Sequence, residues 1–143
     1  MIIPDINLLV YAHNSAATSH EQARVWWEQT LNDTMPVGLP WIVLSGYIRL
    51  MTHPRVLEKP ISVDSARADV DAWLDQSCVL IVEPGEQFRH IFLDTLSQLG
   101  TAGNLTTDTY LAALAIEHQA VLQSFDSDFS RFPGLKWKNP IRL

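Results

Sequence analysis

Two segments decide the fold of this chain, Gly103-Asn104-Leu105-Thr106-Thr107-Asp108-Thr109-Tyr110 and, after an apolar run, Ser124-Phe125-Asp126-Ser127-Asp128-Phe129. Apolar residues recur after Asp108 at spacings of three and four, which predicts a helix that begins near Thr107. The apolar residues 120–125 come next and are long enough for a buried strand, with Asp126 at its end. A helix followed by such a strand is half of a βαβ unit.

The N-terminus repeats this arrangement of an apolar run closed by an acid. Met1-Ile2-Ile3-Pro4 ends in Asp5, and the apolar residues 8–11 follow. In a mainly parallel sheet the carboxyl ends of the strands lie along one edge, where ligands bind, so Asp5 and Asp126 are expected to meet there. Asp108 joins them if its helix begins at the same edge.

Length and composition indicate one domain over residues 1–143, because a chain of this size with 47% hydrophobic residues can bury a core of its own. Strands are expected at 1–4, 78–82 and 120–125, residues 35–40 form a turn or a short second strand, and residues 137–143 are a candidate edge strand. Helices are expected at 7–13, after Ser19, at 41–51, 62–74 and 86–99, and from 107 onward. The alternation predicts an α/β fold, a three-layer sandwich around a short, mainly parallel sheet.

Several kinds of protein are excluded by what the sequence lacks. Cys78 stands alone, so no disulfide framework or thiolate zinc site is available. No apolar run approaches the roughly 18 residues that span a membrane, and Asp5 interrupts the first one, so we expect a cytoplasmic protein without a signal peptide. Phosphate-loop, nucleophile-elbow and His-Glu-x-x-His motifs are also missing.

Clustered carboxylates predict a site for a hard metal ion. They repel one another, and burying them together is costly unless they share protons or bind a cation. Oxygen ligands favour Mg²⁺ and Mn²⁺, and such ions promote phosphoester hydrolysis. Each acid also has a purely structural interpretation, because Asp5 can cap a helix, Asp108 can complement a helix dipole, and Asp126 with Asp128 can form a turn. Only the strand order decides between these interpretations.

The net charge of -6 has the wrong sign for a protein that holds nucleic acid by bulk electrostatics. It does not exclude a nuclease, because a bound metal ion inverts the local charge. Arg49, Arg55 and Arg131 are candidates for phosphate contacts, and solvated surface charge is the alternative. A small phosphatase is a weaker alternative, since Lys59, Lys136 and Lys138 do not follow a predicted core strand.

The chain resembles the PIN-domain ribonucleases, in particular the VapC-type toxins of bacterial toxin/antitoxin pairs. The resemblance covers nearly the whole chain and lies in Asp5-Ile6-Asn7-Leu8-Leu9-Val10-Tyr11-Ala12, Arg49-Leu50-Met51-Thr52-His53-Pro54-Arg55-Val56, Gly103 through Asp108 with Leu111-Ala112-Ala113-Leu114-Ala115, and Ser124 through Phe132. It implies a PIN-like sandwich and a metal-dependent endoribonuclease toxin.

The resemblance also implies roles for individual residues and partners. Asp5, Asp108 and Asp126 would be the catalytic acids and ligands of Mg²⁺, for which Mn²⁺ can substitute, with Asn7 and Ser124 as supports. Arg49, Arg55 and Arg131 would then contact RNA. A homodimer and a cognate antitoxin that covers the acidic groove are implied as well.

One position departs from the family pattern. Many PIN domains carry a glutamate in the helix before the middle motif, where this chain has Gly46. Asp128 is the nearest replacement by sequence as a fourth metal ligand, or else a turn residue. The missing acid keeps a second hypothesis open, a catalytically silent PIN-like module that binds a partner protein or RNA.

Overall fold

A computed structural model describes residues 1–141 of the chain, and within them five strands form one sheet. The strands are β1 (Ile2–Pro4), β2 (Val37–Leu39), β3 (Val79–Ile81), β4 (Val121–Gln123) and β5 (Lys136–Lys138). The helices are α1 (Ile6–His13), α2 (His20–Leu31), α3 (Trp41–Met51), α4 (Val63–Leu74), α5 (Phe88–Leu99) and α6 (Thr106–Glu117), with short 3₁₀ turns η1 (Gly103–Leu105) and η2 (Ser127–Arg131).

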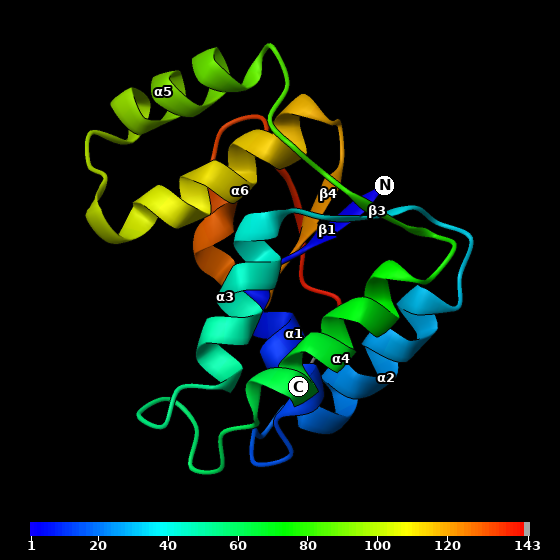
Figure 1. Ribbon diagram of the computed structural model, residues 1–143. Coiled ribbons are helices and arrows are strands. Elements are labelled where there is room, and N and C mark those ends of the chain that lie inside the picture. The colour runs from blue at the N-terminus through cyan, green and yellow to red at the C-terminus, as the bar shows by residue number, and fades with distance from the viewer. Residues whose placement is uncertain (142–143) are drawn as a thin grey trace.

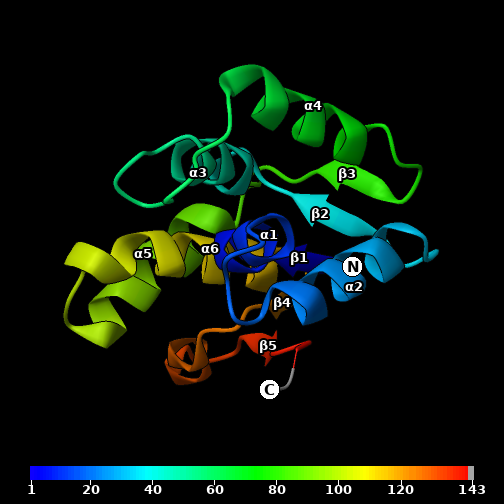
Figure 2. The same cartoon turned by 90° about the horizontal axis from the view of Figure 1, so that it is seen from below.

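The sheet has the order β3-β2-β1-β4-β5, and every neighbouring pair is parallel (Figure 2). The predicted mainly parallel sheet is therefore confirmed. The chain leaves β1 toward β2 on one side and returns to β4 on the other, so the strand order reverses between β1 and β4. Open α/β sheets bind their ligands at such a switch point, outside the carboxyl ends of the strands.

Helices cover both faces of the sheet and complete the predicted three layers. Figure 1 shows α5 and α6 on one side and α1, α2 and α4 on the other, with α3 packed against α1 and α4. The boundaries of α3 and α4 agree with the sequence prediction. Ser62 caps α4 as expected, since its hydroxyl accepts a hydrogen bond from the Ser65 amide.

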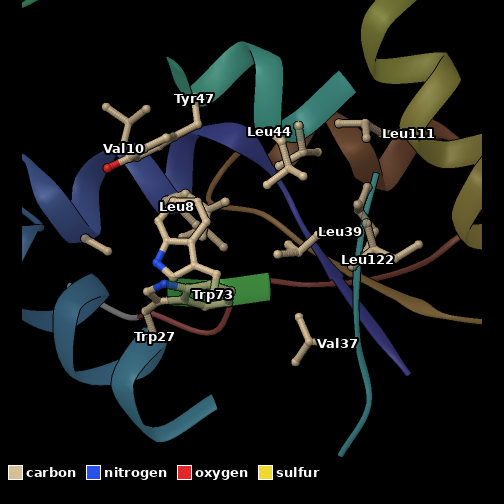
Figure 3. Packing of buried hydrophobic residues seen from close by; sticks show 14 of the residues in the cluster. Leu8, Val10, Trp27, Val37, Leu39, Leu44, Tyr47, Trp73, Leu111 and Leu122 are labelled. Atoms are coloured by element: carbon tan, nitrogen blue, oxygen red, sulfur yellow. The ribbon is translucent and has the colours of Figure 1, made fainter. Parts of the chain in front are cut away.

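Aromatic side chains fill the core on the α1 side of the sheet (Figure 3). The rings of Tyr47 and Trp73 lie 4.6 Å apart and those of Trp27 and Trp73 5.6 Å apart, in the edge-to-face geometry that aromatic pairs favour. Trp27 is buried in this core. Trp26 is only half-buried, and its indole donates a hydrogen bond to the Gln123 side chain.

Two predicted elements, β3 and α5, are less buried than their apolar sequences suggest. The strand predicted at 78–82 is β3, three residues long, and it lies at the edge of the sheet, where Leu80 is 44% exposed. The helix predicted at 86–99 begins at Phe88, and Thr95 is the one residue that it buries fully. The reason is that α5 packs mainly against α6, so most of the cover of its apolar face comes from one helix. Gly100 ends α5 in the left-handed conformation, with a φ of +68°.

Smaller differences concern caps and termini. Ser19 precedes α2 but makes no side-chain capping bond. The thiol of Cys78 is half-buried, with its sulfur 3.5 Å from the Leu31 carbonyl. The candidate strand at 137–143 is β5, which covers Lys136–Lys138, and residues 142–143 lie outside the described part of the chain.

Candidate active site

Asp5 occupies the junction between β1 and α1, at the switch point of the sheet. Pro4 is aligned with Gln123 in the neighbouring strand, so Asp5 and Ser124 leave the sheet side by side. The Asp5 amide donates to the Gln123 carbonyl at 2.8 Å, and Asp5 Oδ1 accepts from the Ile6 amide at 2.7 Å. The side chain therefore caps α1, while the main chain of Asp5 is tied to the end of β4.

Burial dominates the electrostatics of Asp5, which is only 5% exposed. It raises the pKa of the carboxyl above its ordinary value, and the nearby Asp126 carboxylate raises it further. Hydrogen bonds from Ser124 and Ile6 act in the opposite direction because they favour the charged form. A cation at the free lone pairs of such a buried carboxylate would stabilise its charged form.

Ser124 ties the ends of β1 and β4 together through one fully buried hydroxyl. Its Oγ donates to Asp5 Oδ2 at 2.7 Å and accepts from the Asp126 amide at 3.0 Å. The Ser124 carbonyl also accepts a hydrogen bond from the Trp137 indole. Ser124 thus lies in contact with two of the acids, and its supporting role stays a prediction.

Asp126 and Asp128 belong to the turn that follows β4. Asp126 Oδ1 accepts from the Asp128 amide at 2.9 Å and caps η2, so the turn interpretation of this pair describes its local structure correctly. Asp126 is half-buried, whereas Asp128 is exposed.

Asp108 approaches the same edge from the opposite helical layer, on the first turn of α6. Its pKa is raised to about 6, first by burial and then by the carboxylates of Asp5, Asp126 and Asp128. The structure therefore brings four aspartates from three separate chain segments into one electrostatic environment. Their grouping was the condition that the sequence could not test.

The four carboxylates have the chemistry of a site for Mg²⁺ or Mn²⁺, because all their ligand atoms are oxygens and their mutual repulsion favours a cation. They do not form a closed cage: within residues 1–141 no three His, Cys, Asp or Glu side chains converge as a ready metal site. An ion there would be held by a few carboxylates on an open surface, leaving positions for water and phosphate oxygens.

Gly46 lies buried in the middle of α3, at the position where the resemblance leads us to expect a glutamate. A Cβ at this position would lie 2.5 Å from Ile6 Cδ1 and 3.1 Å from Ile6 Cγ1. Ile6 directly follows Asp5, so the residue that lies over Gly46 is a neighbour of the site. An apolar contact thus replaces the missing acid.

The remaining predicted residues lie on the surface. Asn7 is exposed on the first turn of α1 and makes no side-chain hydrogen bond within the described residues. Arg131 is exposed at the end of η2, the turn that contains Asp128. Arg49 and Arg55 are exposed at and after the end of α3. The predicted roles of all four stay predictions.

None of the four aspartates lines either of two hollows in the surface. One of about 490 Å³ is lined by His13, Met51 and Lys59 among others, between α1 and the loop after α3. Another, of about 300 Å³, has Trp41 and Tyr110 in its lining and lies at the carboxyl edge of the sheet. This second hollow was not predicted from the sequence. Its signal was a tryptophan directly after the proline that ends a strand.

A family model described as PIN domain matches residues 2–135. The chain belongs to the PIN domain family. Ribonuclease VapC33 of Mycobacterium tuberculosis H37Rv is 44% identical over 142 residues, which are 99% of this chain and 99% of that protein. Ribonuclease VapC37 of the same strain is 36% identical over 143 residues, 100% of this chain and 99% of its own length. The family resemblance read from the sequence is confirmed.

Solved structures show the same PIN fold. VapBC2 from Rickettsia felis, bound to a DNA fragment from its promoter, matches with a TM-score of 0.66 and 24% identity over 97% of this chain and 98% of that one. Mycobacterium tuberculosis VapC20, described as a Sarcin-Ricin loop cleaving toxin, matches with a TM-score of 0.68 and 16% identity over 95% of this chain and 99% of that one. Within the described part of the PIN domain, no helix has the length and apolar character needed to cross a bilayer.

Proposed function

We propose that this PIN domain is a metal-dependent endoribonuclease toxin of the VapC type, which hydrolyses RNA phosphodiester bonds. The observation that carries the proposal is the meeting of Asp5 and Asp126 at the switch point of the sheet, where the Ser124 hydroxyl joins them. Asp108 on the first turn of α6 lies close enough for their carboxylates to raise its pKa. A chain 44% identical to a ribonuclease over its whole length supports the same activity.

Asp5, Asp108, Asp126 and Asp128 would hold Mg²⁺, and Mn²⁺ would substitute for it. When bound, the ion supplies a polarised phosphate and a water of lowered pKa. The protein's own part is positioning: Ser124 and the Ile6 amide fix the orientation of Asp5, while the Asp126 side chain holds the turn that carries Asp128. Asn7 and Ser124 would support the ligands.

The proposed activity includes partners. Exposed Arg49, Arg55 and Arg131 would contact phosphates of the RNA. A cognate antitoxin would cover the acidic edge and neutralise the toxin in the cytoplasm, and the chain would act as a homodimer. The complexes among the solved relatives, such as VapBC2 from Rickettsia felis, support an antitoxin partner.

A second candidate function is a catalytically silent PIN domain that binds a partner protein or RNA. It is favoured by Gly46, whose place in the site is covered by Ile6, and by carboxylates that do not converge on one point within residues 1–141.

With one acid fewer, the site would bind Mg²⁺ weakly until RNA phosphate adds oxygens. Calorimetric Mg²⁺ titration with and without a non-cleavable RNA tests this step, and equal affinities in both would contradict it.

A cleavage assay separates the two functions. Purified protein is incubated with a pool of single-stranded RNA in Mg²⁺, in Mn²⁺ and in EDTA. The nuclease proposal expects cleavage with either metal, none in EDTA, and loss of cleavage in Asp5→Asn and Asp108→Asn. Asp75→Asn, an exposed aspartate at the end of α4, is the matched control and should cleave normally. Metal-dependent cleavage that both site variants retain would refute the assignment of the acids.

A further inference from the structure

The hollow of about 300 Å³ at the carboxyl edge of the sheet is built by segments that follow two neighbouring strands. Pro40 and Trp41 come directly after β2, and Val82 through Pro84 come directly after β3. Tyr110 closes the hollow from α6. It therefore opens on the same edge of the sheet as the four aspartates.

Its position relative to the acids follows from the sheet. Tyr110 lies two residues after Asp108 on α6, so its backbone is only about 3 Å further along the helix axis, although the two side chains project from different faces of the helix. The ends of β2 and β3 lie one and two strands away from β1, a lateral distance of about 5 to 10 Å at the usual strand spacing. A nucleotide next to the scissile phosphate would reach this far.

The lining is aromatic, and one ring is open to solvent. Trp41 is 52% exposed, unusual for a residue with so much apolar surface. Tyr110 is fixed from behind by Phe88, whose ring centroid lies 4.8 Å away, and by Phe92 at 5.9 Å. The hollow thus combines a tyrosine packed against two other rings with an indole of which about half is open to solvent.

Charge decides which part of a nucleotide the hollow would accept. Glu83 is its charged residue, and Lys and Arg are absent from the lining. A phosphate group would be repelled there, whereas the faces of a base stack on tryptophan and tyrosine. The Glu83 carboxylate can also accept a hydrogen bond from the exocyclic amine of a base such as cytosine.

We infer that the hollow between Trp41 and Tyr110 is a base-stacking subsite for a nucleotide that flanks the cleaved bond in single-stranded RNA. The inference rests on the proposed nuclease function and adds to it a residue that selects and positions the substrate. Trp41 holds the flanking base, and the phosphate one step along the strand then lies over the aspartates. Single-stranded RNA presents unstacked bases for such contacts.

The test is a cleavage series on one oligoribonucleotide whose cut site has been mapped. Each nucleotide flanking the cut is replaced in turn by an abasic residue, and kcat/KM is measured for the wild type, Trp41→Ala and Trp41→Phe. Met35→Ala, an apolar side chain 49% exposed before the start of β2 and thus at the other edge of the sheet, is the matched control. Melting temperatures verify that all variants fold.

One abasic position should lower kcat/KM of the wild type by about five- to 150-fold, the range for loss of one stacked base. Trp41→Ala should show the same loss on intact RNA and no further loss at that abasic position. Trp41→Phe should recover most of the activity, and Met35→Ala should match the wild type. Unchanged cleavage by Trp41→Ala, or abasic effects that persist in it, would overturn the inference.

The outcomes separate this inference from the proposed function. If the wild type cleaves RNA and Trp41→Ala cleaves it equally well, the subsite fails and the nuclease stands. If the wild type does not cleave, the nuclease fails, and the affinity of each variant for each oligonucleotide is measured by fluorescence anisotropy in EDTA. The abasic substitution should then weaken RNA binding by the wild type but not weaken binding by Trp41→Ala any further. A Trp41→Ala variant that loses affinity for an antitoxin while its RNA kinetics stay unchanged would assign the surface to that protein and refute the subsite.

Discussion

Replacement of Ser124 by alanine removes one buried hydroxyl that makes two hydrogen bonds, and its effect on stability can be worked out from the structure. The hydroxyl donates to Asp5 Oδ2 at 2.7 Å and accepts from the Asp126 amide at 3.0 Å. A hydrogen bond to a charged group contributes about 1.5 to 3 kcal/mol and a neutral one about 0.5 to 1.5 kcal/mol. We expect Ser124→Ala to lower the free energy of unfolding by about 2 to 4 kcal/mol at pH 7.

The loss in free energy of unfolding caused by Ser124→Ala should increase with pH. Burial holds the Asp5 pKa above its unfolded value, so this group favours folding most when it is protonated, and that contribution is lost as the pH rises through its folded pKa. The Ser124 hydrogen bond lowers the Asp5 pKa, and its removal raises that pKa further. The difference between wild type and Ser124→Ala should therefore be smaller at pH 4 and grow toward pH 8.

Urea unfolding at pH 4, 6 and 8 in EDTA measures these differences, because it gives a free energy of unfolding for each variant at each pH. Ser127→Ala is the matched control, since Ser127 is exposed in the neighbouring turn, and it should change stability by less than about 0.5 kcal/mol. A loss below about 0.5 kcal/mol for Ser124→Ala, or one that is equal at all three pH values, would refute the role assigned to the hydroxyl.

Three further predictions concern other parts of the site and its frame. Asp108→Asn should stabilise the metal-free protein as the pH rises through about 6, because the wild type there loses the contribution of its protonated carboxyl. Thermal melts in EDTA should show a larger gain in melting temperature over the wild type at pH 8 than at pH 5. Equal gains at both pH values would contradict the raised pKa. Gly46→Ala should destabilise the fold by about 1 to 3 kcal/mol, because the new Cβ meets Ile6 Cδ1. In urea unfolding, Gly46→Ala combined with Ile6→Val should recover part of this loss. If the losses of the two single variants simply added up in the double variant, the contact would be excluded as the cause. Glu117→Gln should accelerate hydrogen exchange at the amides of Gly85 and Gln87, which the carboxylate binds at 2.7 and 2.9 Å, and unchanged protection would show that it does not hold this loop.

Local signals in the sequence were sufficient for much of the fold. Pro40 and Pro54 bracket α3, and Ser62 with Asp64 marks the start of α4, so both helices follow from chemistry within a few residues. Periodicity was less informative for α5, because it identifies an apolar face but not how many elements cover it. The edge position of β3 likewise depends on strand order, which no short segment encodes.

In the candidate site, too, some features follow from local sequence signals and others depend on the order of the strands. The positions of Asp5 and Asp126 after short apolar runs were visible in the sequence, and parallel strands bring them to one edge. The contact of Ile6 with Gly46 joins residues 40 positions apart in the chain, and the hydrogen bond from Ser124 to Asp5 joins residues 119 positions apart. Contacts of this kind appear only once the strands have been placed. The hollow beside Trp41 was missed for the same reason.

Calorimetric titration of Mg²⁺ into EDTA-treated, desalted protein in the presence of non-cleavable RNA tests the central claim most directly, that the four aspartates form one site for a divalent ion. We predict saturable binding to the wild type and to Asp75→Asn, and loss of that binding in Asp5→Asn and Asp108→Asn. Binding of equal strength in all four proteins would show that the ion is held elsewhere and would contradict the account.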